Sequence, residues 1–277
     1  MNRPPAVWAG ITLDRPRIMG VLNATPDSFS DGGDRATESA AIAAGLKMSA
    51  DGADIVDVGG ESTRPGATPV PPDAEQQRVI PVIRALARQG VRVSVDTRNA
   101  STMAAALDAG AMIVNDVSGL GHDPDAAALV ARRGCPVVLM HMRGTPATMR
   151  DRAIYNDVAR DVVSELGACL VHAEQAGIRP EVVVLDPGVG FAKNAAQSIA
   201  ILRALPLLAT LGCPLLVGVS RKSFIGAVAH EPDTGRRLSG SIAAGLFALA
   251  RGAAILRVHD VPETVQAIRV WTALNAD

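Results

Sequence analysis

Residues 51–58 read DGADIVDV, and this short stretch holds the unit that is repeated along the whole chain. Gly52 ends an amphipathic segment, residues 38–50, and the apolar, β-branched run 54–58 follows at once. Glycine just past a helix end adopts the left-handed cap without a steric penalty. A short apolar run without polar alternation is typical of a buried parallel strand. The stretch therefore predicts a helix, a glycine cap and a strand, in that order.

The same order of helix, glycine and apolar run occurs seven times. The glycines are Gly52, Gly90, Gly110, Gly134, Gly177, Gly212 and Gly252. The runs after them are 54–58, 91–95, 112–117, 136–140, 182–186, 214–219 and 254–258, and an eighth run, 17–23, precedes them all. Strands that alternate with helices predict a parallel sheet. Eight such units, with no GxGxxG motif after the first strand, favour a closed (β/α)₈ TIM barrel over an open doubly wound sheet.

Length and composition agree with one α/β domain that spans residues 1–277. The chain is 48% apolar, enough to fill one large core, and α/β barrels reach this length as a single domain. Residues 17–277 are predicted to form the barrel. Residues 1–16 lie outside the repeat, and the stretch VWAGITLDRP, residues 7–16, predicts a short hairpin that covers the bottom of the barrel.

Composition also argues against several classes of protein. A net charge of −1 argues against a groove that binds nucleic acid by neutralising phosphates, and 3% aromatic residues are too few for base stacking. No apolar stretch reaches the ~18 residues of a membrane span, and no signal peptide is evident. Three cysteines in apolar segments, Cys135, Cys169 and Cys213, fit no metal site and predict a reducing, cytoplasmic location.

Unusual polar residues gather in the segments that lead from each strand to the next helix. These segments are residues 23–33, 59–67, 95–99, 115–119, 141–144, 186–191, 220–224 and 257–260. In a (β/α)₈ barrel they all meet at the carboxyl-terminal face, where active sites of this fold lie. Any one of them is equally well explained as a turn or a helix cap. Eight of them, opposite plain helix-to-strand turns, favour a functional site.

The residue types in these segments indicate what the site binds. Asp96, Asn115 and Asp186 suit a flat heterocycle that presents several N–H donors, and Lys222 offers a donor in return. The two aspartates are equally well explained, one at a time, as helix caps.

A second group of residues predicts an anion site. Arg257 and His259 lie two residues apart, so on a strand they point the same way. A lone histidine is more often a buried core residue, and the neighbouring arginine is what favours function. Phe29 and Arg64 lie in long Gly/Pro/Ser-rich loops that predict mobile covers over a reaction.

Eight motifs together resemble the dihydropteroate synthase family, in order and over nearly the whole chain. They are GVLNATPDSFSDGG, DVGGESTRPGA, SVDT, NDVSG, LMHMRGTPATM, LDPGVGF, SRKSFIG and LRVHDV, between residue 17 and about residue 261. The ESTRPGA and SRKSFIG segments are specific to this family, whereas DPGVGF and NDVSG also resemble the wider group of pterin-binding barrels. One departure is Arg143, where the family usually has glutamine. It is expected at the rim of the site.

The resemblance implies a reaction. In it, p-aminobenzoate displaces pyrophosphate from 6-hydroxymethyl-7,8-dihydropterin diphosphate to give 7,8-dihydropteroate. The expected mechanism is a largely dissociative, Mg²⁺-assisted loss of pyrophosphate, without an activated nucleophile. The resemblance also suggests a homodimer formed through outer helices near the carboxyl-terminal half.

The resemblance further implies a role for each matching residue. Asp96, Asn115, Asp186 and Lys222 bind the pterin, and Met140 packs on its ring. Asn23, Arg257 and His259 bind the diphosphate, and Asn23 also ligates Mg²⁺. Thr63, Arg64, Pro65, Ser220, Phe29 and Asp31 surround p-aminobenzoate. Asp96, Asp186, Lys222 and Arg257 are the expected catalytic residues.

Two alternative functions remain open at the level of sequence. A methyltetrahydrofolate–corrinoid methyltransferase of the same barrel group would share Asp96, Asn115 and Asp186. It would have no use for Arg257 with His259, or for ESTRPGA. A catalytically silent paralogue that only binds a pterin would keep every motif.

Overall fold

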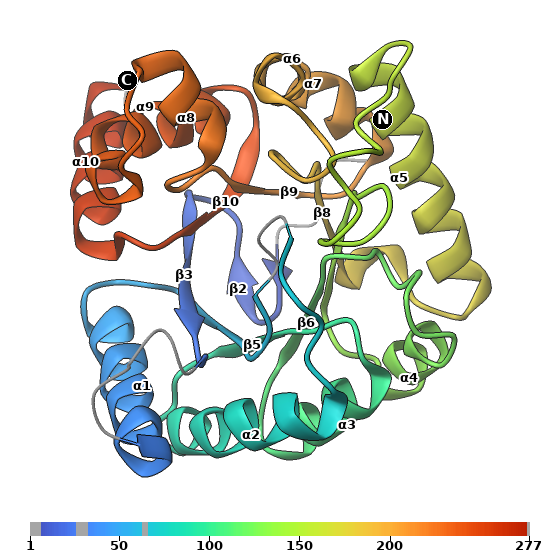
Figure 1. The fold of residues 1–277 in the computed structure, drawn as a ribbon, viewed down its shortest axis with the longest axis vertical. Helices are drawn as coiled ribbons and strands as arrows, with labels where there is room; N and C mark the ends of the chain where they lie inside the picture. Colours follow the sequence, from blue (N-terminus) through green and yellow to red (C-terminus); the bar gives the residue numbers. More distant parts are fainter. Residues whose placement is uncertain (1–6, 26–32, 63–65, 276–277) are drawn as a thin grey trace.

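The computed structural model describes residues 7–25, 33–62 and 66–275, and its centre is a closed barrel of eight parallel strands (Figure 1). The barrel strands are β3 (Arg17–Asn23), β4 (Ile55–Gly59), β5 (Val93–Asp96), β6 (Ile113–Asp116), β7 (Val137–Met140), β8 (Val183–Asp186), β9 (Leu215–Gly218) and β10 (Ala253–Val258). Each pairs with its neighbours in sequence, and the last strand, β10, pairs with the first, β3. The predicted (β/α)₈ barrel is confirmed.

Helices surround the barrel on the outside (Figure 1). They are α1 (Gly33–Ala50), α2 (Pro72–Arg88), α3 (Ala100–Asp108), α4 (Ala126–Arg133), α5 (Val158–Gln175), α6 (Ala195–Arg203), α7 (Leu205–Leu208), α8 (Ser223–Ala229), α9 (Leu238–Ala250) and α10 (Val261–Leu274). Short 3₁₀ turns occupy Pro180–Val182, Ala209–Leu211 and Thr234–Arg236. Within the described ranges, none of the helices combines the length and apolar character that crossing a membrane requires.

The repeated glycines have the conformation that the sequence predicts. All seven have positive φ angles, from 59° at Gly134 to 110° at Gly110. Gly110 also lies in a close contact, because a Cβ atom there would lie 2.7 Å from the Cβ of Ala87. The glycines therefore follow the helices that precede β4 to β10, and they turn the chain toward the next strand.

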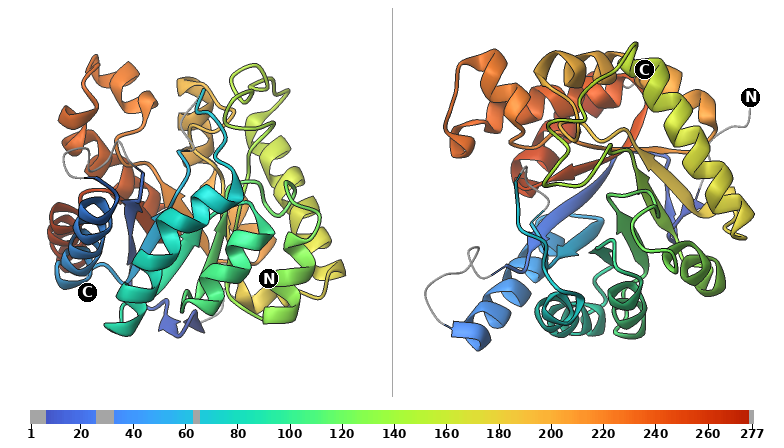
Figure 2. Two further views of the ribbon diagram at one scale, coloured as in Figure 1. Left: turned by 60° about the horizontal axis from the view of Figure 1, so that its bottom comes forward. Right: turned by 45° about the vertical axis from the view of Figure 1, so that its right-hand side comes forward.

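The predicted hairpin closes the amino-terminal end of the barrel. Strands β1 (Val7–Trp8) and β2 (Ile11–Thr12) pair antiparallel, and the hairpin lies below the barrel in the left view of Figure 2. The Trp8 ring is 1% exposed, and its Nε1 donates to the Val182 carbonyl over 2.8 Å. Trp8 and Ile11 pack against an inner layer of apolar side chains: Met19, Ile55, Ile113, Val138, Val184, Leu216 and Ile255.

The inner apolar layer also identifies which side chains point into the barrel nearer its carboxyl-terminal end. Side chains two positions apart on a strand share a face. The next inward positions along the chain are therefore the site positions. They hold Val21, Asp57, Asn115, Met140, Asp186, Gly218 and Arg257, and Asp96 follows the buried Ser94 in the same way. The floor of the site thus carries five polar side chains on top of an apolar core.

Candidate active site at the carboxyl end of the barrel

The structure brings the predicted pterin residues together at the barrel mouth. Asp96, Asn115, Met140 and Asp186 are 8%, 4%, 4% and 5% exposed, and each lies in the last residues of its strand. Lys222 lies just before α8, and Arg257 is the second-to-last residue of β10. The predicted residues Phe29, Asp31, Thr63, Arg64 and Pro65 lie outside the described residues.

Arg257 has partners that the sequence did not indicate. Its Nε donates to Asp57 Oδ2 over 2.7 Å, and its Nη2 donates to Asp96 Oδ2 over 2.7 Å. Asn115 Nδ2 donates to the same Asp57 oxygen over 2.9 Å. Asp57 is fully buried. The guanidinium expected to face an anion is therefore held by two carboxylates, because a buried charge needs paired groups around it.

Burial changes the acid–base chemistry of this group. Burial raises the pKa of Asp96 to about 7, and the Arg257 guanidinium opposes that rise. Burial lowers the pKa of Arg257, but Asp57 and Asp96 outweigh it, so the pKa lies above its usual range. Arg257 therefore stays charged, and its ion pair with Asp96 favours the ionised form of that carboxyl, which burial opposes.

The segment after β8 curls back over Asp186. The Gly188 amide donates to Asp186 Oδ1 over 2.7 Å, and the His141 amide donates to the Asp186 carbonyl over 2.9 Å. Lys222 Nζ donates to the Val189 carbonyl and lies 4.8 Å from the centre of the Phe191 ring. Burial raises the pKa of Asp186 and lowers that of Lys222 to about 8. One Asp186 oxygen is thus used by the backbone, and among the described residues no donor is hydrogen-bonded to the other.

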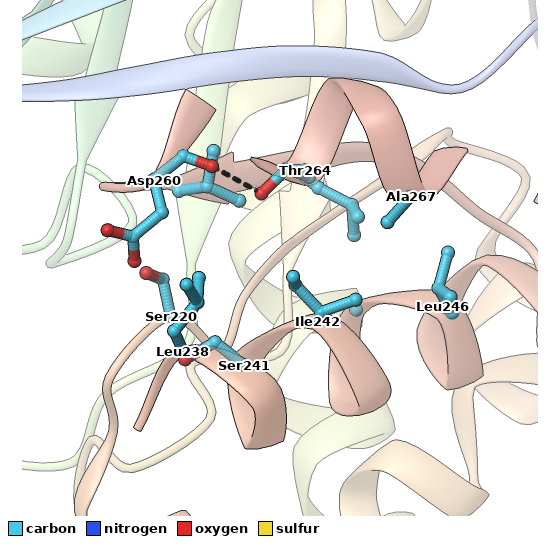
Figure 3. A pocket seen from close by; sticks show the side chains of 11 residues that line it. Ser220, Leu238, Ser241, Ile242, Leu246, Asp260, Thr264 and Ala267 are labelled. Atoms are coloured by element: carbon cyan, nitrogen blue, oxygen red, sulfur yellow. Dashed lines mark hydrogen bonds between the residues drawn. The ribbon is translucent and has the colours of Figure 1, made fainter. Parts of the chain in front are cut away.

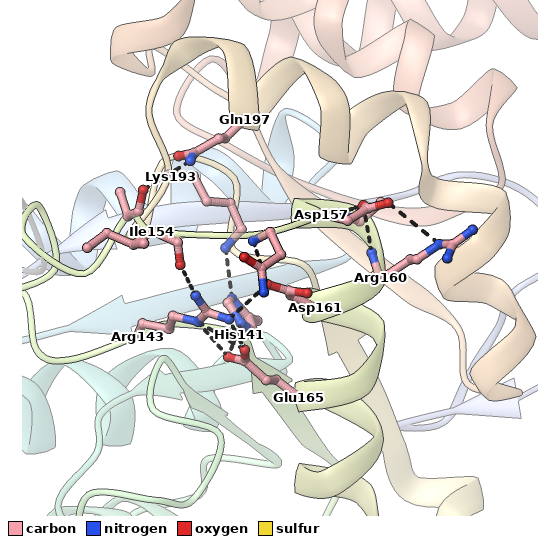
Figure 4. A network of polar contacts seen from close by, with 12 residues as sticks. His141, Arg143, Ile154, Asp157, Arg160, Asp161, Glu165, Lys193 and Gln197 are labelled. Carbon is pink, nitrogen blue, oxygen red and sulfur yellow. Dashed lines mark hydrogen bonds and ion pairs between the residues drawn. The ribbon is translucent and has the colours of Figure 1, made fainter.

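A buried polar network supports that segment from behind (Figure 4). Lys193 Nζ donates to His141 Nδ1 over 2.8 Å and to the carbonyls of Gly188 and Phe191 over 3.1 and 3.0 Å. His141 Nε2 faces Glu165 Oε2 at 2.9 Å, on α5. Burial lowers the pKa of Lys193 to about 7 and that of His141 to about 4. The imidazole is therefore neutral, and it accepts from the lysine while it donates to Glu165.

The loops after β9 and β10 are fastened to each other. Ser220 Oγ accepts from the His259 amide at 3.2 Å and lies 3.0 Å from His259 Nδ1. Arg221, which has φ +58°, donates from Nε to Asp260 over 3.0 Å. Its amide donates to Ser241 Oγ over 2.8 Å, which joins the loop to α9. A strained residue is thus held in place next to Lys222.

The cavity lined by Ser220 and Asp260 lies outside the barrel mouth (Figure 3). It lies between α9 and α10, against the outward-facing Leu256 and Val258 of β10, and most of its lining is apolar. Thr264 Oγ1 donates to the Asp260 carbonyl there over 2.6 Å. We regard this cavity as part of helix packing behind the site.

Comparison with known proteins identifies the group to which the chain belongs. A family described as pterin binding enzyme matches residues 19–259. Dihydropteroate synthase of Synechocystis is 45% identical over 276 residues, which is 98% of this chain and 96% of the relative. Dihydropteroate synthase of Neisseria meningitidis serogroup B is 47% identical over 271 residues, 96% of this chain and 95% of the relative. The chain belongs to the dihydropteroate synthase family of pterin-binding enzymes.

Solved structures of the family have the same fold. The Xanthomonas albilineans dihydropteroate synthase determined with 4-aminobenzoic acid superposes with a TM-score of 0.92 at 48% identity, over 97% of each chain. The same enzyme in complex with 7,8-dihydropteroate gives 0.88 at 45% identity, over 96% of each chain. The family is one of transferases, and the matches favour it over the corrinoid methyltransferase considered from the sequence.

Arg143, the departure from the usual family pattern, lies beside the site. It contacts Glu165 and the Ile154 carbonyl, and its guanidinium lies 4.0 Å from the centre of the Tyr155 ring. Asp161 Oδ2 lies 3.3 Å from its Nη2. The side chain is 26% exposed, in agreement with a place at the rim. It fastens the loop after β7 to α5.

Three residues of this site were missed by the sequence reasoning. Asp57 had a signal, since it is a charged residue inside the apolar run 54–58 and two positions after Ile55. Lys193 and Phe191 had none, because their roles depend on how the segment after β8 folds back. Within the described residues, no three His, Cys, Asp or Glu side chains are grouped so that they could hold a metal ion.

Proposed function

We propose that the protein joins 6-hydroxymethyl-7,8-dihydropterin diphosphate to p-aminobenzoate and releases pyrophosphate. The observation that carries this proposal is the set of buried acceptors at the barrel mouth, on Asp96, Asn115 and Asp186, with Lys222 as the donor beside them. A flat pterin edge presents N–H groups to such acceptors. The related enzyme of Xanthomonas albilineans was solved with 4-aminobenzoic acid and with 7,8-dihydropteroate.

The proposed reaction depends on the stabilisation of developing charge rather than on an activated nucleophile. The bond between the pterin methylene carbon and the diphosphate oxygen breaks, and its electron pair leaves with the diphosphate. The amine of p-aminobenzoate then bonds to the carbon and loses a proton. Asp96 and Asp186, both buried, stabilise positive charge on the pterin more strongly than they would in water.

The diphosphate is proposed to lie between β3 and β10. Asn23 ends β3, which pairs with β10, and His259 follows β10 directly. The bonds of Arg257 to the two carboxylates use Nε and Nη2. Both N–H groups of Nη1 and the second N–H of Nη2 are left for the diphosphate.

Asn23 fits a Mg²⁺ ion that arrives with the substrate. Mg²⁺ keeps several waters and is usually held by one or two protein oxygens together with substrate phosphates. Asn23, half-buried at the end of β3, offers one amide oxygen of this kind. When bound, the ion supplies Lewis-acid stabilisation of the leaving diphosphate.

The p-aminobenzoate is proposed to bind above the pterin. Of the residues assigned to it, Ser220 is described and is 6% exposed, bonded to His259. Phe191, half-buried beside Lys222, offers an aromatic face in the same region. The assignments of Phe29, Asp31, Thr63, Arg64 and Pro65 remain predictions.

We also propose a homodimer that forms through α9. The exposed positions of this helix include Ser239, Ala243, Phe247 and Ala250, and none of these four carries a charge. Phe247 is 38% exposed. An uncharged helix face of this kind is typical of an interface. Phe247→Asp should give a monomer in sedimentation equilibrium, whereas Val171→Asp on α5 should not change the mass.

A cytoplasmic location is proposed as well. Cys135, Cys169 and Cys213 are all free thiols, and burial raises the pKa of each. Raised pKa values keep thiols unreactive, which suits a reducing compartment.

One assay tests the proposed reaction against the silent paralogue. Pyrophosphate release is measured from the pterin diphosphate with Mg²⁺, with and without p-aminobenzoate. We expect release that depends on p-aminobenzoate and is lost in Asp186→Asn. A wild-type protein that binds 7,8-dihydropteroate but releases no pyrophosphate would be a silent paralogue.

A further inference from the structure

We infer that Asp57 is a positioning residue that fixes which atom of the Asn115 amide faces the pterin. The inference rests on the proposed function, since it concerns how that site reads its substrate. It starts from one oxygen, Asp57 Oδ2, which accepts from Asn115 Nδ2 at 2.9 Å and from Arg257 Nε at 2.7 Å.

The orientation of the amide follows from donor and acceptor chemistry. A carboxylate beside a guanidinium offers only acceptors, so Asn115 must turn its NH₂ group toward Asp57. The opposite orientation would place two acceptor oxygens 2.9 Å apart inside the barrel. Asn115 Oδ1 is then left for the substrate, and among the described residues no protein group donates to it.

Asp57 itself makes no direct contact with solvent. It is fully buried, and its second oxygen, Oδ1, has no hydrogen-bond partner in the described part of the chain. Through Arg257 it also reaches Asp96, because Arg257 Nη2 donates to Asp96 Oδ2 over 2.7 Å. One carboxylate beneath the pterin subsite therefore positions three residues that would touch the substrate.

Removal of the shared acceptor tests this directly. In Asp57→Leu, no oxygen remains opposite Asn115, so the amide is free to turn its NH₂ group toward the pterin. In Asp57→Asn, the new amide can place its oxygen at the position of Oδ2, where it still accepts from Asn115 Nδ2 and from Arg257 Nε. In Asn115→Asp, two carboxylates face each other.

The measurement is calorimetric titration with 7,8-dihydropteroate, with the thermal unfolding midpoint of each variant. We expect Asp57→Leu and Asn115→Asp to weaken binding about 10- to 100-fold, the scale of an unpaired buried polar group. We expect Asp57→Asn, which keeps the shared acceptor, to bind within about threefold of wild type. Asp54→Asn is the matched control. Asp54 is also a largely buried carboxylate paired with arginines, Arg15 and Arg17, but near the barrel bottom. It should leave the affinity unchanged.

Two outcomes would overturn the inference. They are an Asp57→Leu variant that folds and binds like wild type, and an Asp57→Asn variant that binds as weakly as Asn115→Asp. If Asp57→Leu fails to fold, Asp57→Asn compared with Asn115→Asp carries the same test. The proposed function is judged separately, by p-aminobenzoate-dependent pyrophosphate release in the wild type.

Discussion

Individual charged residues at the barrel mouth owe their chemistry to burial. Asp96 and Asp186 lie in the interior end of the barrel, where burial raises the pKa of both carboxyls. The same burial lowers the pKa of Lys222 to about 8. The pKa of each group is therefore closer to neutral than it would be in water. A neighbouring charged group opposes each shift.

The lowered pKa of Lys222 predicts an alkaline limit to activity. Above about pH 8 this lysine loses its proton, so kcat/KM for the pterin diphosphate should fall about tenfold per pH unit. Unfolded lysine keeps its proton up to about pH 10.4. The unfolded state thus binds more protons between these values, and this group adds to the free energy of unfolding as pH rises. Lys222→Arg should move the limit upward, since arginine stays charged. An unchanged profile in that variant would assign the limit to another group.

Asp186→Asn is expected to lose pterin binding while it keeps the fold. The Gly188 amide donates to Asp186 Oδ1 over 2.7 Å, so the new amide keeps its oxygen there and turns its NH₂ toward the substrate. Two donors then meet, at a cost of about 1–3 kcal/mol in binding free energy. Calorimetry that showed wild-type affinity for 7,8-dihydropteroate would contradict the assigned orientation.

Among the individual elements, the segment between β8 and α6 is the one that most clearly shapes the site. It holds Asp186 at one end and Lys193 at the other, and the lysine bonds back to Gly188 and Phe191. The segment packs directly on the end of β7, through the bond from the His141 amide to the Asp186 carbonyl. Its shape is therefore set by close backbone contact.

Gly188→Ala should be strongly destabilising, and Gly134→Ala provides the matched control. Both glycines have positive φ, +65° and +59°. A Cβ atom at Gly188 would lie 1.9 Å from the His141 carbonyl oxygen, whereas one at Gly134 meets nothing within 4 Å. The control should lose about 1–2 kcal/mol of the free energy of unfolding. Gly188→Ala should lose more and should also weaken pterin binding. Equal losses in urea unfolding would show that the contact with His141 is easily relieved.

In the whole molecule, the residues that stabilise the fold and the residues of the proposed site lie at opposite ends of the barrel. The hairpin lies at one end of the barrel (Figure 2) and packs against the inner apolar layer, and the buried polar side chains of the strand ends lie at the other. In this fold the loops at the carboxyl end carry the site, and the opposite face contributes stability. Changes at the two ends should therefore have different effects.

Trp8→Ala tests this separation. Trp8 is 1% exposed and fills the bottom of the barrel, so its loss should reduce the free energy of unfolding by about 3–5 kcal/mol. Affinity for 7,8-dihydropteroate, measured well below the unfolding midpoint, should stay unchanged. Trp271→Ala, at a half-buried position of α10, should cost less. A large fall in affinity for Trp8→Ala would show that the two ends are coupled.

Local signals in the sequence were enough to predict the barrel, the positions of its strands and the end at which the polar residues gather. These features follow from local signals: a glycine after each helix, an apolar run after each glycine, and polar residues where each run ends. Two-residue periodicity also fixes which side chains point inward. Asp96, Asn115 and Asp186 were predicted at strand ends, and they lie in the last residues of β5, β6 and β8, whereas Met140 was named only because of the family resemblance.

The pairing of those side chains could be seen only in the folded barrel. Arg257 and Asp57 are 200 residues apart in the chain, and His141 and Lys193 are 52 apart. No local pattern encodes such distances, because the partners meet only when the barrel closes. The isolated sequence showed an arginine free to bind an anion. The closed barrel placed two carboxylates against it, since a charge removed from water must be paired within the protein.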